Sequence, residues 1–214
     1  MDVDYNKVIN FEPLRKLIDE EGLKIKAVAV KVSMEPNTLS RMLKNEYVPK
    51  SDTLVKLAYV LKVPVSRIVD LKLDADPVKA NWFDSHHLPY LPMDNVEGKL
   101  TYQPLWNFLD MYLEYLYNKT GKEKTVNDVF DLIEPCRRRN NIKCGAGKEI
   151  AMKSVEARFG KDYKPVTRKR KYEAKGLTPE TRHKLRADLP VNIRTIYDIC
   201  KFLGCPVDWV VSYK

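Results

Sequence analysis

Residues 34–70 read MEPNTLSRMLKNEYVPKSDTLVKLAYVLKVPVSRIVD, and residues 177–211 read LTPETRHKLRADLPVNIRTIYDICKFLGCPVDWVV. Both stretches begin with Pro-x-Thr and a basic helical segment, break at a proline, and continue into an apolar segment that opens with Thr-Leu or Thr-Ile. Both end in Val-Pro-Val or Cys-Pro-Val before a last apolar pair. Internal repeats decide architecture, so we expect two copies of one small helical unit.

The chain has 214 residues, 44% of them hydrophobic, which is enough for one or two globular domains. It contains no apolar run near the ~20 residues that cross a bilayer. Its N-terminus, MDVDYNKVINFE, has neither the basic region nor the apolar region of a signal peptide. We therefore expect a cytoplasmic protein with no membrane partner.

Four cysteines, Cys136, Cys144, Cys200 and Cys205, match no common zinc-binding spacing. Cys200 and Cys205 fall where the first repeat has Ala58 and Val63, which are core positions, so we expect them to be buried. The chain also has no Ser/His/Asp or Cys/His arrangement, no paired-carboxylate motif and no cofactor fingerprint. The sequence predicts no enzyme, no metal and no cofactor.

The first unit, residues 1–72, has the apolar spacing of five short helices. Gly22 ends the first helix and Pro36 begins the third, where a missing N–H costs nothing. Ser51 or Asp52 is expected to cap the fourth helix. The positions predicted to face the core are Leu14, Leu17, Ile18, Val28, Ala29, Val32, Leu39, Met42 or Leu43, Leu54, Leu57, Ala58, Leu61, Val65, Ile68 and Val69.

Residues 22–69 resemble the Cro/repressor class of helix-turn-helix domains, the XRE family. The positions that carry the resemblance are Gly22-Leu23, Val28-Ala29, Val32, Thr38-Leu39-Ser40, Pro49, Thr53-Leu54, Leu57-Ala58, Leu61 and Val63. The resemblance implies that the third helix enters the major groove of double-stranded DNA with its N-terminal half on the base edges.

The resemblance also assigns roles by position. It implies base contacts by Pro36, Asn37, Ser40 and Arg41, and Asn can pair with adenine and Arg with guanine. It implies phosphate contacts by Lys24, Lys26, Lys44, Asn45 and Tyr47. The chain departs from the family pattern at three places: Lys24-Ile25 replaces the usual Thr-Gln, Ser33 replaces the turn glycine, and Glu35 adds a charge that repels phosphate.

Residues 73–100 are rich in Pro, Asp and Asn and lack a sustained period, so they are predicted to be a linker. Trp82, Phe83, Leu88, Tyr90 and Leu91 make it apolar enough to pack against a domain. His86 and His87 have no neighbouring Cys or carboxylate arrangement typical of a metal site.

The second unit, residues 101–214, has the same pattern of apolar helices as the first unit, but it differs in the length of its first helix and at Phe130. Its first helix is longer, with Leu105, Phe108, Leu109 and Leu113 in phase, and its second helix is expected to start after Thr125. Phe130 stands where the first unit has Ala29, so we expect the second and third helices to be forced apart or reoriented. The fourth helix is predicted over residues 191–203, and the sequence VDWVV is predicted to form the fifth.

An insertion, residues 134–175, separates the second and third helices of this unit. It holds 14 of the 38 Lys and Arg residues but 5 of the 29 Asp and Glu residues, which accounts for the net charge of +9. KSVEARF and VTRKRKYEA alternate like paired strands, which predicts a basic β-hairpin; a solvated loop is the alternative. The predicted nucleic-acid or partner contacts of the second unit are Arg137, Arg138, Arg139, Arg168, Lys169, Arg170, Lys171, Arg182 and Lys184.

The predicted fold is mainly α, with two five-helix domains of the Cro/repressor type. The predicted function is a sequence-specific, double-stranded DNA-binding transcriptional regulator: a repressor from a phage or mobile element. The chain would act as a homodimer or as a covalent pseudo-dimer. The alternative is an anti-CRISPR-like interaction protein of a mobile element that blocks a host nuclease or ribonucleoprotein, with or without repression of its own operon.

Overall fold

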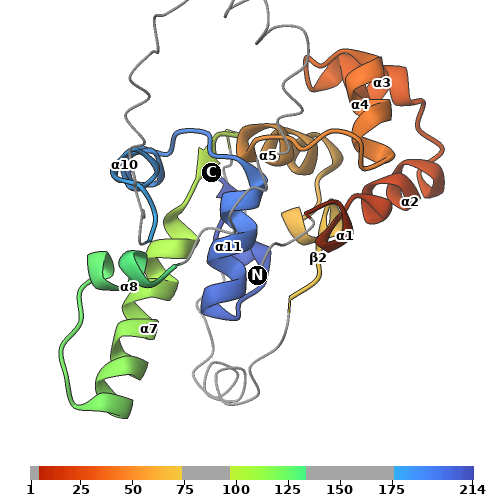
Figure 1. Ribbon diagram of the computed structural model, residues 1–214. Coiled ribbons are helices and arrows are strands. Elements are labelled where there is room, and N and C mark those ends of the chain that lie inside the picture. The colour runs from red at the N-terminus through yellow and green to blue at the C-terminus, as the bar shows by residue number, and fades with distance from the viewer. Residues whose placement is uncertain (1–4, 74–96, 134–175) are drawn as a thin grey trace, which may run out of the picture.

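The computed structural model describes residues 5–73, 97–133 and 176–214, and these are mainly helical (Figure 1). We call residues 5–73 the N-terminal half and the described residues from 97 onward the C-terminal half. The predicted insertion, including its hairpin, and most of the predicted linker lie outside the described residues.

The N-terminal half consists of short helices closed by a strand pair. A two-residue strand precedes α2 and pairs antiparallel with another that follows the last helical turn. The elements are α1 (Tyr5–Val8), β1 (Ile9–Asn10), α2 (Glu12–Glu20), α3 (Ile25–Lys31), α4 (Pro36–Leu43), α5 (Ser51–Leu61), the 3-10 helix η1 (Val65–Arg67) and β2 (Asp70–Leu71).

The C-terminal half has the same order of elements from its first strand to its last, with the undescribed residues 134–175 between α8 and α10. Its strands also pair antiparallel. The elements are β3 (Leu100–Thr101), α7 (Gln103–Thr120), α8 (Val126–Leu132), α10 (Pro179–Arg186), α11 (Ile193–Leu203), η2 (Val207–Trp209) and β4 (Ser212–Tyr213). Figure 1 shows α5 and α11 between the α3–α4 pair and the α8–α10 pair.

The ends of the helices follow from local sequence. Prolines stand in the first turns of α2, α4, α7 and α10, where no backbone N–H is needed. Gly22, at φ +62°, follows α2 as predicted. The predicted cap at Thr125 is confirmed: its hydroxyl accepts from the backbone N–H of Asp128, whose carboxylate accepts from the N–H of Thr125. The hydrogen bonds from Thr125 lower the pKa of the Asp128 carboxyl.

Two predicted starts are wrong. Helix α5 begins at Ser51 itself, after Lys50, and neither Ser51 nor Asp52 occupies the cap position. The Ser51 hydroxyl is instead bonded to groups of the other half. Helix α11 begins at Ile193 rather than Val191, because the Asn192 side chain caps it by accepting from the N–H of Arg194.

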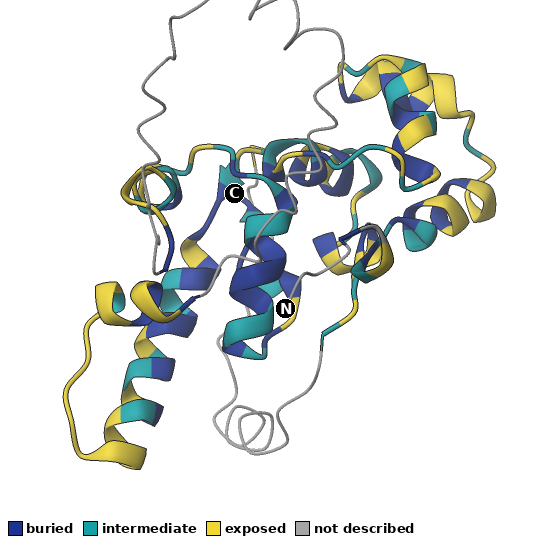
Figure 2. Cartoon of the chain, in the orientation of Figure 1, coloured by how far each residue is buried: buried dark blue, intermediate teal, exposed yellow. Residues whose placement is uncertain are grey.

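One hydrophobic core runs through both halves (Figure 2). Of the positions predicted to face it in the first unit, all are buried except Leu61, which is partly buried. In α7, Leu105, Phe108 and Leu109 are buried and Leu113 is partly buried. Cys200 and Cys205 are buried free thiols, as predicted, and burial raises the pKa of Cys200 well above its usual value.

The two halves meet through reciprocal backbone hydrogen bonds. Ser51 donates its N–H to the carbonyl of Val191 at 2.8 Å, and Ile193 donates to the carbonyl of Pro49 at 3.3 Å. Ser51 and Ile193 are the first residues of α5 and α11, so each half donates and accepts from the same position. This exchange is the signature of a two-fold, self-complementary interface.

Side chains extend this interface on both sides. The Tyr5 hydroxyl donates to the Asp198 carboxylate at 3.1 Å, and the Ser66 N–H donates to Asp208 Oδ1 at 2.9 Å. Tyr213 packs edge-on against Tyr59, with ring centroids 5.7 Å apart. The halves are therefore joined by polar as well as apolar contacts.

A buried chain of hydrogen bonds lies at the centre of the interface. The Val191 N–H donates to Ser51 Oγ at 3.0 Å, the two hydroxyls of Ser51 and Tyr102 lie 2.7 Å apart, and the Tyr102 hydroxyl donates to the Leu189 carbonyl at 3.2 Å. All these groups are satisfied together when Tyr102 donates its single hydrogen to the Leu189 carbonyl and Ser51 donates to Tyr102. Burial raises the pKa of Tyr102 to about 12.

Candidate nucleic-acid interface

Helices α3 and α4 form a helix-turn-helix whose turn spans residues 32–35. Ser33, at φ +55°, occupies the place of the usual turn glycine. The turn is closed by the N–H of Met34, which donates to the carbonyl of Ala29 at 2.9 Å. Ala29 is fully buried, so its small side chain permits the close approach of the two helices.

Helix α4 packs one face against the core and presents the opposite face to solvent. Leu39 and Met42 are 0% exposed and Leu43 is 8% exposed, which holds the helix against the core. The opposite face presents Asn37, Ser40, Arg41 and Lys44. Asn37 and Arg41 are exposed, and within the described part of the chain neither side chain has a hydrogen bond or ion pair, so both are available to a ligand.

The residues predicted to contact phosphate lie in two environments. Lys24, Lys26 and Lys44 are exposed on the elements that flank the turn, as a contact to a polyanion requires. Tyr47 is half-buried against the core. The predicted contacts to bases and phosphates remain predictions.

Asn45 has a structural function that the sequence did not predict. It ends α4 at φ +58°, and its side-chain oxygen accepts from the N–H of Phe11 at 3.0 Å. Its amide donates to Asn10 Oδ1 at 3.2 Å. These bonds tie the end of α4 to the start of α2, so Asn45 fixes the position of α4. The paired asparagines at 10 and 45, which are far apart in sequence, gave no local signal.

Helix α10 occupies the corresponding place in the C-terminal half, but its side chains are arranged differently. Arg182 is among the contacts predicted for this unit, yet its side chain is 16% exposed and pairs with Asp131. Lys184 lies 2.5 Å from Glu180. Proximity to Lys184 lowers the pKa of Glu180. The other predicted contacts of this unit, Arg137, Arg138, Arg139, Arg168, Lys169, Arg170 and Lys171, lie outside the described residues.

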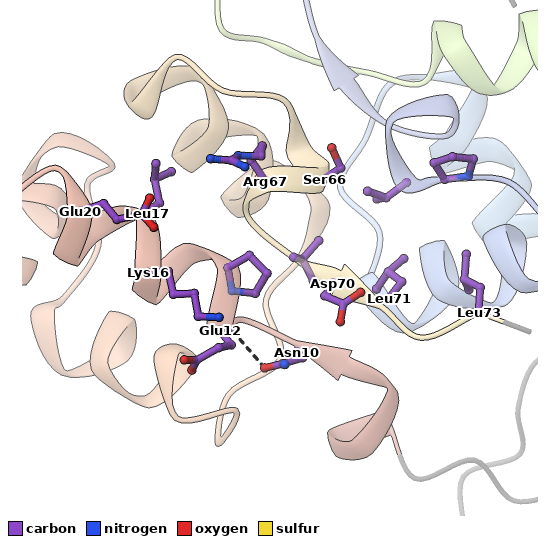
Figure 3. Close-up of a pocket in the computed structure, with 14 residues that line it drawn as sticks. Asn10, Glu12, Lys16, Leu17, Glu20, Ser66, Arg67, Asp70, Leu71 and Leu73 are labelled. Carbon is purple, nitrogen blue, oxygen red and sulfur yellow. Dashed lines mark hydrogen bonds between the residues drawn. The ribbon is translucent and has the colours of Figure 1, made fainter.

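A hollow of about 560 Å³ lies between α2, the η1–β2 segment and residues 206–207 (Figure 3). Its charged lining residues are of both signs: Glu12, Lys16, Glu20, Arg67 and Asp70. The hydrogen bond drawn in Figure 3 runs from the Glu12 N–H to Asn10 Oδ1. No residue of α4 lines this hollow, and its three carboxylates against two cations do not favour an anionic ligand.

Two further observations concern the described residues as a set. None of their helices combines the length and apolar character of a membrane span. No three His, Cys, Asp or Glu side chains among them gather in a way that could hold a metal ion.

A family model described as Helix-turn-helix matches residues 14–68, from the first buried leucine of α2 to the residue after η1. Residues 14–68 are a helix-turn-helix domain. This family binds double-stranded DNA and is generally non-enzymatic. Helix α4 is the second helix of the helix-turn-helix in this domain, which is the helix that enters the major groove in such domains. No curated protein and no solved structure matches the chain.

Proposed function

We propose that this protein is a sequence-specific, double-stranded DNA-binding transcriptional regulator that reads bases with α4. The observation that carries the proposal is the free face of α4, where Asn37 and Arg41 are exposed and have no partner within the described chain. A bidentate Asn–adenine or Arg–guanine pair contributes roughly 1–3 kcal/mol of discrimination. Pro36 and Ser40 lie beside them and complete the base-contacting surface.

Phosphate contacts would orient the domain on the duplex. Lys24, Lys26 and Lys44 supply these phosphate contacts. Asn45 keeps α4 in position through its bonds to Phe11 and Asn10. Tyr47, which is half-buried after α4, would approach the phosphate backbone of the DNA with its hydroxyl. These contacts add affinity without adding sequence information.

We also propose that the C-terminal half is a divergent copy of the helix-turn-helix domain. Four places at which the backbone takes positive φ recur at matching points of the two halves, three of them with a change of residue. Gly22 and Gly121 follow the first long helices, and Lys62 and Gly204 follow α5 and α11. The other pairs are Ser33 with Gly176 before the third helices, and Asn45 with Asp188 after them. The reciprocal bonds between Ser51–Val191 and Ile193–Pro49 support a covalent pseudo-dimer.

The basic segment 134–175 would add sequence-independent affinity. Its predicted contacts, Arg137, Arg138, Arg139, Arg168, Lys169, Arg170 and Lys171, fall in the stretch that carries the excess positive charge of the chain. Cations that neutralise phosphates release counterions, so their loss weakens binding to all sequences and flattens its dependence on salt.

A regulator of this design is best tested with the DNA upstream of its own gene, because we propose that it is a repressor of a phage or mobile element. We expect an electrophoretic shift with that DNA at low salt. Replacing Asn37 and Arg41 with Ala should abolish preference for the site over random DNA, while Lys56→Ala on the exposed side of α5 serves as a matched control. Absence of any shift by the wild-type protein at low salt would refute the proposal.

The second candidate is an anti-CRISPR-like interaction protein that blocks a host nuclease or ribonucleoprotein. The observation that favours it is the segregation of positive charge into residues 134–175, away from the helix-turn-helix domain at residues 14–68. Under this hypothesis, removal of the charges at residues 168–171 would abolish inhibition of the nuclease, whereas the change of Asn37 and Arg41 would not.

A further inference from the structure

Helices α4 and α10 can be compared position by position because both begin Pro-x-Thr. In α4, the core contacts come from Leu39, Met42 and Leu43. The matching positions of α10 hold Arg182, Leu185 and Arg186, and Leu185 alone is buried there. Helix α10 therefore has two arginines at positions where α4 has leucines.

Both arginines bind groups of their own half. Arg182 donates from Nε to the Leu177 carbonyl at 2.8 Å and pairs with Asp131, and its guanidinium lies 5.9 Å from the centre of the Phe130 ring. Phe130 stands where the N-terminal half has Ala29, so a large ring and a cation replace the alanine and leucine of the other half. Arg186 donates to the Asn127 side chain at 2.9 Å.

The positions of the base-contacting pair are also changed. Glu180 matches Asn37 and Lys184 matches Arg41. Glu180 and Lys184 lie one helical turn apart and form an ion pair at 2.5 Å. A carboxylate at the first of these positions repels phosphate, and the lysine that follows is already neutralised. In α4 the equivalent side chains have no partner among the described residues.

We propose that α10 does not read bases: it is fixed to α8 by its own cations, and α4 is the helix that determines specificity within the described chain. This inference rests on the proposed DNA-binding function and adds the prediction that recognition is one-sided. A two-fold arrangement of the halves then coexists with an operator that is not palindromic.

The first test is selection of preferred sites from random duplexes by the full-length wild-type protein. We expect one half-site of defined sequence with no inverted copy at a fixed distance. Two half-sites of equal information content bound by one copy of the chain would overturn the inference while leaving the proposed function intact. Failure of the wild-type protein to bind any duplex at low salt would overturn the proposed function, and the inference with it.

The second test compares the same change at matched positions, Arg41→Ala and Lys184→Ala. Loss of a base contact should lower affinity for the selected site by about 10–100-fold and erase preference at one position, so we expect this from Arg41→Ala. We expect Lys184→Ala to leave the selected bases unchanged and to alter affinity by no more than about twofold, as for an exposed ion pair. A change in the selected bases with Lys184→Ala would overturn the inference.

Arg182→Leu supplies a variant that restores the residue type of α4. The leucine should keep the helix folded by packing on Phe130, which circular dichroism can verify, and base preference should again be unchanged. If Arg182→Leu unfolds, Asp131→Asn, which removes the ion pair but keeps the Arg182 stem in place, gives the same readout. An altered base preference in a folded Arg182→Leu or Asp131→Asn variant would contradict a purely structural role of Arg182.

Discussion

Replacing Tyr102 with Phe tests whether the hydrogen-bond chain at the centre of the interface stabilises the protein. The change removes the hydroxyl that donates to Leu189 and accepts from Ser51. Ser51 is 0% exposed, so its hydroxyl would be left without an acceptor and without access to water. An unsatisfied buried polar group costs ~1–3 kcal/mol, and we expect a loss of about 2 kcal/mol in the free energy of unfolding. For a chain of this size that corresponds to a fall in Tm of ~4–8 °C.

Urea denaturation followed by circular dichroism measures this loss, with Tyr117→Phe as the matched control. Tyr117 is 52% exposed on α7, and its substitution should change the unfolding free energy by less than ~0.5 kcal/mol. Equal effects of the two substitutions would refute the reasoning, because the buried chain would then contribute no more than an exposed hydroxyl.

The stability difference between the wild type and Tyr102→Phe is also expected to depend on pH. Burial raises the pKa of Tyr102 from 10.0 to about 12, so the folded state favours the protonated phenol. The stability that this provides is complete below about pH 10 and is lost as the pH rises towards about 12. The difference between the wild type and Tyr102→Phe should therefore shrink by about 1.4 kcal/mol between pH 8 and pH 11. A constant difference across this range would contradict the assignment.

Three further changes probe local geometry, each measured as the free energy of unfolding in urea. Ser33→Gly should stabilise by about 0.5–1 kcal/mol, because Ser33 sits at φ +55° where glycine is unstrained, and a loss of stability would contradict this. Thr125→Ala should cost ~1 kcal/mol by removing the reciprocal cap with Asp128; no change would show that the cap is dispensable. Gly176→Ala should cost more than Gly121→Ala. Both sites have positive φ, but a Cβ at Gly176 would lie 2.5 Å from the Asp131 Cα, whereas nothing lies within 4 Å at Gly121. Equal costs would mean that the backbone around Gly176 shifts to accommodate the Cβ with little loss of stability.

The sequence predicted the helices and their buried faces because apolar spacing is a local property. In α2, for example, Leu14, Leu17 and Ile18 stand at helical spacing, and all three are buried. The pattern also predicted the burial of Cys200 and Cys205, since both stand at positions that are apolar in the first repeat.

The predictions that failed concern side chains that bind a residue far away in the sequence. Ser51 has the residue type of a cap, but its hydroxyl binds Tyr102 of the other half. Arg182 has the residue type of an exposed helix face, but the ring of Phe130 and the carboxylate of Asp131 draw it inward. The two-residue strands are too short to show a period. Only the tertiary arrangement reveals such contacts.

The reciprocal bonds between residues 49–51 and 191–193 have a consequence for behaviour at low abundance. Subunits of an ordinary dimer separate when few copies are present, and their joint action then falls with the square of concentration. Here both sides of the interface belong to one polypeptide, so dilution does not separate them. Each side can also change by a single substitution without an identical change on the other. The interface already shows this, because Ser51 begins α5 and Ile193 begins α11.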